Sequence, residues 1–306
     1  QWISGTKAKQ WSTKSESPLP CLGQRSKRSK RSKRSKRSKR SKRSKRSKRS
    51  KRSKRSKDIP VKQSCRPSNK ENPVSFAALQ KCSLSDYPGE IAAIAFTQGC
   101  NFRCPFCHNP ELIPRKATLA SPLEGRELLR FLSARRGKLS ALVISGGEPS
   151  LQKDLPTFIE QVRSMGFKLK LDTNGSKPDL LQELLNDSLL DYVAMDVKAP
   201  LSKYSKLCGC SVDTEAIERS IDLIISSSIE SEFRTTVISP LLSREDLLYI
   251  AQRLQGCQRY VMQKFRPEGS LLDPSLSQWT ESMNRDELEE LSKDFNERSI
   301  PCIVRY

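Results

Sequence analysis

Six short apolar runs alternate with helical patterns from about residue 76 to the end of this 306-residue sequence. The runs have the length and β-branched content of buried strands, and each is followed by a segment with helical periodicity. Strands that alternate with helices form parallel sheets, because each helix carries the chain back to the same edge of the sheet. The predicted strands cover residues 91–96, 141–145, 167–172, 192–197, 233–238 and 260–265.

Helices are predicted at residues 122–136, 155–165, 178–185, 214–227, 244–254 and 284–297, and a final edge strand at residues 303–306. Eight strand–helix units would close a full barrel, so six units predict an α/β fold with an open, partial (β/α)6 barrel and helices outside it. In barrels of this kind the chemistry gathers at the carboxyl ends of the strands. Polar residues that directly follow the predicted strands are therefore the candidates for a functional site.

Residues 1–75 differ from the rest in being rich in Ser, Lys, Arg, Gln and Pro and poor in large apolar side chains. Such a segment buries too little apolar surface to offset the entropy of ordering, so we expect a disordered, basic, low-complexity tail followed by one folded domain at residues 76–306. Residues 25–57 are 11 Arg-Ser-Lys triplets. They form either a polybasic tail or an expanded repeat that is not part of the native protein. The first methionine is Met165, so we expect a non-Met start codon, a fragment or an over-extended reading frame.

The formal net charge of +22 belongs to this tract, which carries 22 basic residues and no acidic ones. The 34 basic residues elsewhere balance the 34 acidic residues of the chain. Nucleic-acid binding is therefore a distant alternative that rests on the tract alone. No apolar run approaches the roughly 20 residues that a membrane-spanning helix needs. Since no secretion signal is present either, we expect a cytoplasmic protein with reduced cysteines.

Three cysteines, Cys100, Cys104 and Cys107, follow the first predicted strand at the spacing C-x3-C-x2-C. Thiolates this close together on one loop are typical of metal and iron–sulfur sites. Three are one short of closing a four-iron cluster, which would leave one iron open to a substrate. Zinc would need a fourth ligand, and the single histidine, His108, is adjacent to Cys107, where both side chains rarely reach one metal. A disulfide plus a free thiol would require secretion.

The remaining cysteines are scattered along the chain. Cys208, Cys210, Cys257 and Cys302 do not form the group of about four thiolates that a second cluster needs. They are interpreted as structural or incidental, because free cysteine is often a small buried hydrophobe.

Three polar motifs follow later predicted strands. They are Gly146-Gly147-Glu148, Asp172-Thr173 and Asp196-Val197-Lys198. Two glycines let a ligand approach the backbone, and a glutamate beside them can accept from an ammonium group. Each aspartate could instead cap the turn that follows its strand. Arg234 lies inside the fifth apolar run, where a charge needs a partner; a cofactor carboxylate and a structural ion pair are both open.

The cysteine motif, with Phe106 between its last two cysteines, resembles the signature of the radical S-adenosylmethionine superfamily. The resemblance implies that the three cysteines bind a [4Fe–4S] cluster whose fourth iron binds the methionine end of S-adenosylmethionine, and that the fold is the six-unit partial barrel. The cofactor-binding residues that it implies are Phe106, Gly146, Gly147, Glu148, Asp172, Thr173, Asp196, Lys198 and Arg234. The glycine turn would contact the amino group of the cofactor.

Longer stretches are similar to the anaerobic ribonucleoside-triphosphate reductase activating proteins, a family of glycyl-radical-enzyme activating enzymes. These stretches are residues 84–89, 98–112, 195–200, 232–237 and 263–267. In the pyruvate formate-lyase activating enzyme, the matching Asp-Thr and Asp hold a monovalent cation against the cofactor carboxylate. The resemblance would therefore make Asp172, Thr173 and Asp196 ligands of a monovalent cation.

This resemblance implies an oxidoreductase whose cluster is reduced by a flavodoxin-like or ferredoxin-like donor. Reductive cleavage of S-adenosylmethionine would then give a radical that removes a hydrogen from a glycine of a partner enzyme. No catalytic side chain is expected beyond the cluster and the cofactor. Anaerobic ribonucleotide reductase is the expected partner; another glycyl radical enzyme of the pyruvate formate-lyase type, or a small-molecule substrate, is the alternative.

Overall fold

The computed structural model describes residues 74–114, 122–239, 241–267, 269–278 and 283–306. The tail predicted at residues 1–75, with its Arg-Ser-Lys tract, lies outside the described residues except for its last two positions. The described residues all belong to one of the two compact units into which the chain divides. The other unit, Gln10–Lys70, lies wholly outside them.

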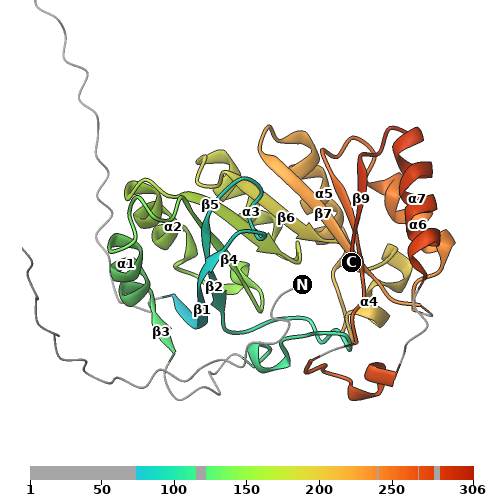
Figure 1. Ribbon diagram of the computed structural model, residues 1–306, viewed down its shortest axis with the longest axis horizontal. Coiled ribbons are helices and arrows are strands. Elements are labelled where there is room, and N and C mark those ends of the chain that lie inside the picture. Colours follow the sequence, from blue (N-terminus) through green and yellow to red (C-terminus); the bar gives the residue numbers. More distant parts are fainter. Residues whose placement is uncertain (1–73, 115–121, 240, 268, 279–282) are drawn as a thin grey trace, which may run out of the picture. The chain divides into compact units, whose positions relative to one another are not determined.

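A nine-stranded sheet, counted over the described residues, forms the centre of this unit (Figure 1). Seven of its strands are parallel and follow each other in chain order: β2 (Ala92–Thr97), β4 (Ala141–Gly146), β5 (Lys168–Thr173), β6 (Tyr192–Asp196), β7 (Glu230–Val237), β8 (Tyr260–Lys264) and β9 (Cys302–Arg305). The first six confirm the predicted strands, and β9 is the expected edge strand. Because β9 pairs only with β8 in the sheet order, the sheet stays open, as a partial barrel does.

Two antiparallel strands extend the sheet beyond β2, and neither was predicted from the sequence. They are β1 (Ser75–Ser83), which pairs with β2, and β3 (Leu123–Glu124), which pairs with β1. Residues 80–82 of β1 are exposed and polar in part, so the strand lacks an apolar run. The helix predicted from residue 122 begins later, because Glu124 is extended and forms a capping box with Glu127.

Helices lie along the outer side of the parallel strands (Figure 1). They are α1 (Gly125–Ser133), α2 (Leu155–Ser164), α3 (Pro178–Asn186), α5 (Thr214–Ser226), α6 (Arg244–Arg253) and α7 (Arg285–Glu297), with the short α4 (Tyr204–Leu207) after β6. Each of the six longer helices confirms a predicted one. Their apolar faces pack on the sheet, as Ile217, Ile221 and Ile224 of α5 do. No helix in the described ranges is long and apolar enough to cross a membrane.

Side chains alternate between the two faces of each strand. On β5, Leu169 and Leu171 join the core beneath the helices, so Lys170 and Asp172 face the inside of the curved sheet. On β7, Phe233 joins the same core, and its neighbours Glu232 and Arg234 face inward. The inner face is therefore charged on β5 and β7. On β2, β4 and β6 it is lined mainly by a smaller apolar cluster.

Candidate active site

A cavity of about 180 Å³ lies at the carboxyl ends of the parallel strands, between these ends and the loop that follows β2. The twelve predicted site residues all line it: Cys100, Cys104, Phe106, Cys107, Gly146, Gly147, Glu148, Asp172, Thr173, Asp196, Lys198 and Arg234. They meet here because parallel strands end at the same edge of the sheet. Their roles as ligands stay predictions.

The cysteine loop, residues 99–108, is held by backbone hydrogen bonds from distant parts of the chain. Gly99 N and Cys100 N donate to the carbonyl oxygens of residues 112 and 113, at 2.8 and 3.0 Å. Arg103 N donates to Cys208 O at 2.7 Å, and residues 272 and 273 donate to the carbonyl oxygens of residues 107 and 105 at 3.2 and 2.8 Å. The positions of the three cysteines are thus set by three separate segments.

Burial and a neighbouring thiol shift the pKa values of the three cysteines of the loop. It raises the pKa of Cys100 to about 12 and lifts the pKa of Cys107 above its ordinary value. A hydrogen bond with the neighbouring Cys208 thiol has the opposite effect on Cys104 and lowers its pKa. Because metal ligation requires thiolates, cluster binding must release protons from this loop.

The chemistry of the cysteine loop fits an iron–sulfur cluster. Three soft sulfur donors on a short loop are the ligand set that such clusters use. In the described part of the chain, no three His, Cys, Asp or Glu side chains are placed together to hold a single metal ion. A four-iron cluster does not need such convergence, because each of its cysteines binds a different iron.

His108 is held outside the ligand set. Its Nε2 lies 2.9 Å from the carbonyl oxygen of Arg266, and its ring stacks on Phe265 with 5.8 Å between centroids. The histidine thus fastens the segment after β8 to the cysteine loop.

The two glycines of the turn after β4 are required by packing within the chain. A Cβ at Gly146, whose φ is +120°, would lie 2.2 Å from the amide nitrogen of Thr97. A Cβ at Gly147 would lie 2.2 Å from the carbonyl oxygen of Gly99. A side chain at Gly146 would therefore push the turn away from the end of β2, and one at Gly147 would push it away from the start of the cysteine loop.

Glu148 is 1% exposed, and its carboxylate accepts four hydrogen bonds from the protein. Oε1 accepts from the backbone and hydroxyl of Ser150, at 3.0 and 2.5 Å, and from the Thr173 hydroxyl at 2.8 Å. Oε2 accepts from Asn174 N at 2.7 Å. Burial nonetheless raises the pKa of Glu148. The residue clamps the glycine turn to the end of β5, and accepting from an ammonium group would come on top of this role.

Asn174 was not predicted as a site residue. Its side-chain amide donates to Asn101 Oδ1 at 2.9 Å, which ties the end of β5 to the cysteine loop. The only available signal was its position directly after the Asp172-Thr173 motif.

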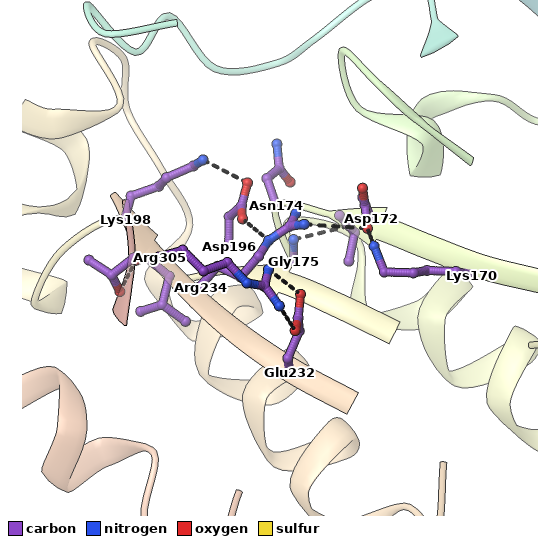
Figure 2. Close-up of polar contacts among 12 residues, drawn as sticks. Lys170, Asp172, Asn174, Gly175, Asp196, Lys198, Glu232, Arg234 and Arg305 are labelled. Atoms are coloured by element: carbon purple, nitrogen blue, oxygen red, sulfur yellow. Dashed lines mark hydrogen bonds and ion pairs between the residues drawn. The ribbon is translucent and has the colours of Figure 1, made fainter. Parts of the chain in front are cut away.

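A chain of buried ion pairs forms the floor of the cavity (Figure 2). The Lys170 ammonium pairs with Asp172 Oδ1, to which Arg234 Nη1 also lies at 3.6 Å. Arg234 Nε pairs with Asp196 Oδ1 at 2.8 Å, and Lys198 Nζ with Asp196 Oδ2 at 2.9 Å. Burial alone would raise the pKa of Asp196, but the two cations outweigh it and hold that pKa well below its usual range.

The sequence left two partners open for Arg234, a cofactor carboxylate and a structural ion pair. The structure contains the ion pair. Its guanidinium is 2% exposed and lies between Asp172 and Asp196. Below it, Arg305 of β9 donates to both oxygens of Glu232, at 2.7 and 3.2 Å, and the Tyr192 hydroxyl donates to the same carboxylate at 3.2 Å.

Cys208 and Cys210 pack against the cysteine loop. Cys208 is fully buried and interacts with the thiol of Cys104, and the thiol of Cys210 donates to the carbonyl oxygen of Asn101 at 3.5 Å. Cys257 and Cys302 lie in the core under the helices. The interpretation of all four as structural or incidental residues stays a prediction, and Cys208 touches a predicted cluster ligand.

Comparisons with known proteins bear on this arrangement. The family model described as the Radical SAM superfamily matches residues 94–254. A relative from Methanocaldococcus jannaschii, named "Putative glycyl-radical enzyme activating enzyme", is 37% identical over 191 residues, which are 61% of this chain and 78% of that protein. A 7-carboxy-7-deazaguanine synthase of Aquifex aeolicus is 38% identical over 82 residues, which are 26% of this chain and 34% of that protein.

A similar fold occurs among solved structures. Streptococcus suis SuiB bound to precursor peptide SuiA matches 70% of this chain with a TM-score of 0.55 and 16% sequence identity. The match spans 48% of the SuiB chain, about half of its length. At this level of identity the likeness concerns the fold alone.

Proposed function

Because this chain belongs to the Radical SAM superfamily, we propose that it cleaves S-adenosylmethionine reductively and generates a glycyl radical on a partner enzyme. The observation that carries the proposal is the shared cavity, in which the cysteine loop faces the ends of β4 to β7. Further support is the 37% identity to a relative named for glycyl-radical enzyme activation.

In this proposal Cys100, Cys104 and Cys107 hold a [4Fe–4S] cluster. When bound, the cluster and S-adenosylmethionine supply the electron and the radical chemistry. The protein supplies the setting: the buried rings of Phe102 and Phe106 flank the cysteines and exclude water from them. The Phe102 amide also donates to Cys100 Sγ at 3.4 Å, the kind of hydrogen bond that tunes a cluster's potential.

S-adenosylmethionine would lie between the cysteine loop and the cavity floor. The glycine turn brings its backbone beside the cysteine loop, and Glu148 and Thr173 stand next to it. Asp172 Oδ2 is buried and has no hydrogen-bond partner among the described residues, so it can accept one from a bound cofactor. Lys198 and Arg234 bring positive charge to the floor, where the cofactor carboxylate would bind.

The partner proposed is an anaerobic ribonucleotide reductase, with a flavodoxin-like or ferredoxin-like electron donor. An open sheet suits a protein substrate, because a loop that bears a glycine must reach the carboxyl ends of the strands. The segments around the site that resemble reductase activating proteins, among them residues 98–112 and 263–267, support this choice over other glycyl radical enzymes.

Electron paramagnetic resonance tests the proposal. The full chain would be reconstituted with iron and sulfide without oxygen, reduced, and mixed with S-adenosylmethionine and an anaerobic ribonucleotide reductase. We expect a glycyl-radical doublet with the wild type and with Cys257→Ala, a control at a buried cysteine away from the cavity. We expect none with Cys104→Ala.

Two other outcomes would change the proposal. If the reconstituted protein does not produce 5′-deoxyadenosine and methionine from S-adenosylmethionine, the cofactor assignment is wrong. If it cleaves the cofactor but gives no doublet, the reductase is not the partner, and other glycyl radical enzymes or small molecules must be tested.

A further inference from the structure

The buried side chain of Lys170 contacts one of the carboxylates that the sequence resemblance makes ligands of a monovalent metal ion. Its side chain is 1% exposed, and its ammonium group pairs directly with Asp172, one of the three expected cation ligands. The residue lies on the inner face of β5 beneath Asp172 and is absent from the cavity lining. Burial on the inner face of the strand and the ion pair with Asp172 hold its side chain there.

The other expected carboxylate ligand is occupied in the same way. One carboxylate oxygen of Asp196 pairs with Arg234 at 2.8 Å, and the other pairs with Lys198 at 2.9 Å. Arg234 also lies 3.6 Å from the Asp172 oxygen that Lys170 contacts. Each carboxylate therefore already has two basic groups beside it, and an added metal ion would stand next to like charges.

The charge balance of the cavity points to an anion. Among the charged residues that line the cavity, five are basic, Lys198, Arg234, Lys264, Arg266 and Arg305, and three are acidic, Glu148, Asp172 and Asp196, so positive charge is in excess. Excess charge at a partly buried site is stabilised when an opposite charge is supplied. A ligand carboxylate in the cavity above Lys198 and Arg234 would supply it.

We propose that Lys170 is a positioning residue that takes the place of a bound monovalent cation, so that this protein binds S-adenosylmethionine without potassium or sodium. The ammonium group of Lys170 neutralises Asp172 from beneath. Arg234 and Lys198 are then left to attract the cofactor carboxylate. The inference rests on the proposed function, because it assumes that S-adenosylmethionine occupies this cavity.

Thermal unfolding tests the cation part without S-adenosylmethionine. The reconstituted full chain would be heated under argon in potassium, sodium or choline chloride at equal ionic strength and followed by circular dichroism. A cation that binds the folded protein raises the melting temperature with its concentration. We expect the same melting temperature for the wild type in all three salts. Lys170→Ala should melt lower in choline and regain stability in potassium, because the vacated place beside Asp172 can then hold an ion.

Affinity for S-adenosylmethionine, measured by the change in the spectrum of the reduced cluster, tests the cofactor part. The dissociation constant of the wild type should vary by less than about twofold between the salts. That of Lys170→Ala should rise by roughly tenfold in choline and recover in potassium, within the 5–150-fold range of coupled sites. Lys168→Ala is the matched control, since Lys168 lies on the same strand but is 56% exposed and pairs with Glu90.

Each outcome decides a separate point. A potassium-specific or sodium-specific rise in the melting temperature or affinity of the wild type would overturn the inference, and so would a Lys170→Ala variant that behaves like Lys168→Ala. If Lys170→Ala does not fold, Lys170→Met, which removes the charge but keeps much of the side-chain volume, should show the same dependence on potassium. A wild type that binds no S-adenosylmethionine in any salt would refute the proposed function, while the melting data would still test the cation site.

Discussion

Replacing Gly147 with alanine should separate the glycine turn from the cysteine loop. A Cβ at this position would lie 2.2 Å from the Gly99 carbonyl oxygen, where contacts under 3.0 Å are essentially never seen. The two backbones must therefore move apart by at least 0.8 Å, the difference between 3.0 and 2.2 Å. The hydrogen bond from Glu148 N to Gly99 O, now 2.8 Å, would lengthen to about 3.6 Å and break.

The cost can be worked out from these contacts. The clash is between backbone atoms, so no side-chain rotation relieves it, and overpacking of this kind costs about 1–3 kcal/mol. The lost buried hydrogen bond adds about 1 kcal/mol. We expect Gly147→Ala to lower the free energy of unfolding by about 2–4 kcal/mol. Because Gly99 directly precedes Cys100, the same shift should reduce the iron bound per chain.

Urea denaturation of the iron-free protein, with iron analysis after reconstitution, measures both effects. Gly137→Ala is the control for replacing a glycine without a clash, because no described atom lies within 4 Å of a Cβ at Gly137. Unlike Gly147, Gly137 has a positive φ, +75°. The free energy of unfolding of the control should fall by only about 1–2 kcal/mol, the cost of alanine in a left-handed conformation. The control should bind iron normally. If Gly147→Ala matches this control in stability and iron content, the close approach of the two loops does not shape the site.

Acid should destabilise the protein through Glu232. Burial alone would raise its pKa, but hydrogen bonds from Arg305 and nearby positive charges lower it. The stabilisation is therefore complete above the unfolded pKa of about 4.3 and is lost as the pH falls through the folded pKa; in urea titrations Glu232→Gln should show a shallower loss. Asn174→Ala, which removes the 2.9 Å hydrogen bond to Asn101, should cost about 1 kcal/mol in the same titrations and weaken S-adenosylmethionine binding. Removing iron with a chelator should end S-adenosylmethionine cleavage but leave the far-ultraviolet circular dichroism unchanged, because backbone hydrogen bonds hold the cysteine loop.

The parallel part of the fold could be predicted because its strands are apolar runs separated by polar turns and amphipathic helices. β1 could not, since its second half is exposed and antiparallel pairing does not require a continuous apolar run. The clustering of the candidate residues followed from topology, because each lies on the loop after β2, within the carboxyl-terminal half of a parallel strand, or directly after one. That is why residues as distant as Cys100 and Arg234 line one cavity.

The pairing of the charges could not be predicted, because it depends on strand register. Asp196 of β6 lies directly opposite Arg234 of β7. The sequences of the two strands do not specify which residues will face each other. Lys170 carried no signal of its own, since a lysine between two leucines is as consistent with a solvated face as with a charged interior. The face of β5 that carries Lys170 is buried because the sheet curves around it.

The hydrogen bonds that fix the cysteine loop also determine when, during synthesis of the chain, the loop can fold. The cysteines leave the ribosome early, but two of the segments that hold their backbone, at Cys208 and at Leu272-Asp273, are made much later. The last of these follows Cys107 by 165 residues, which at ~5–20 residues per second is on the order of ten seconds of synthesis. During that time the loop lacks the backbone hydrogen bonds that later hold it, so its three thiols have no fixed positions. Correct loading with iron therefore belongs after translation, when nearly the whole domain has been made.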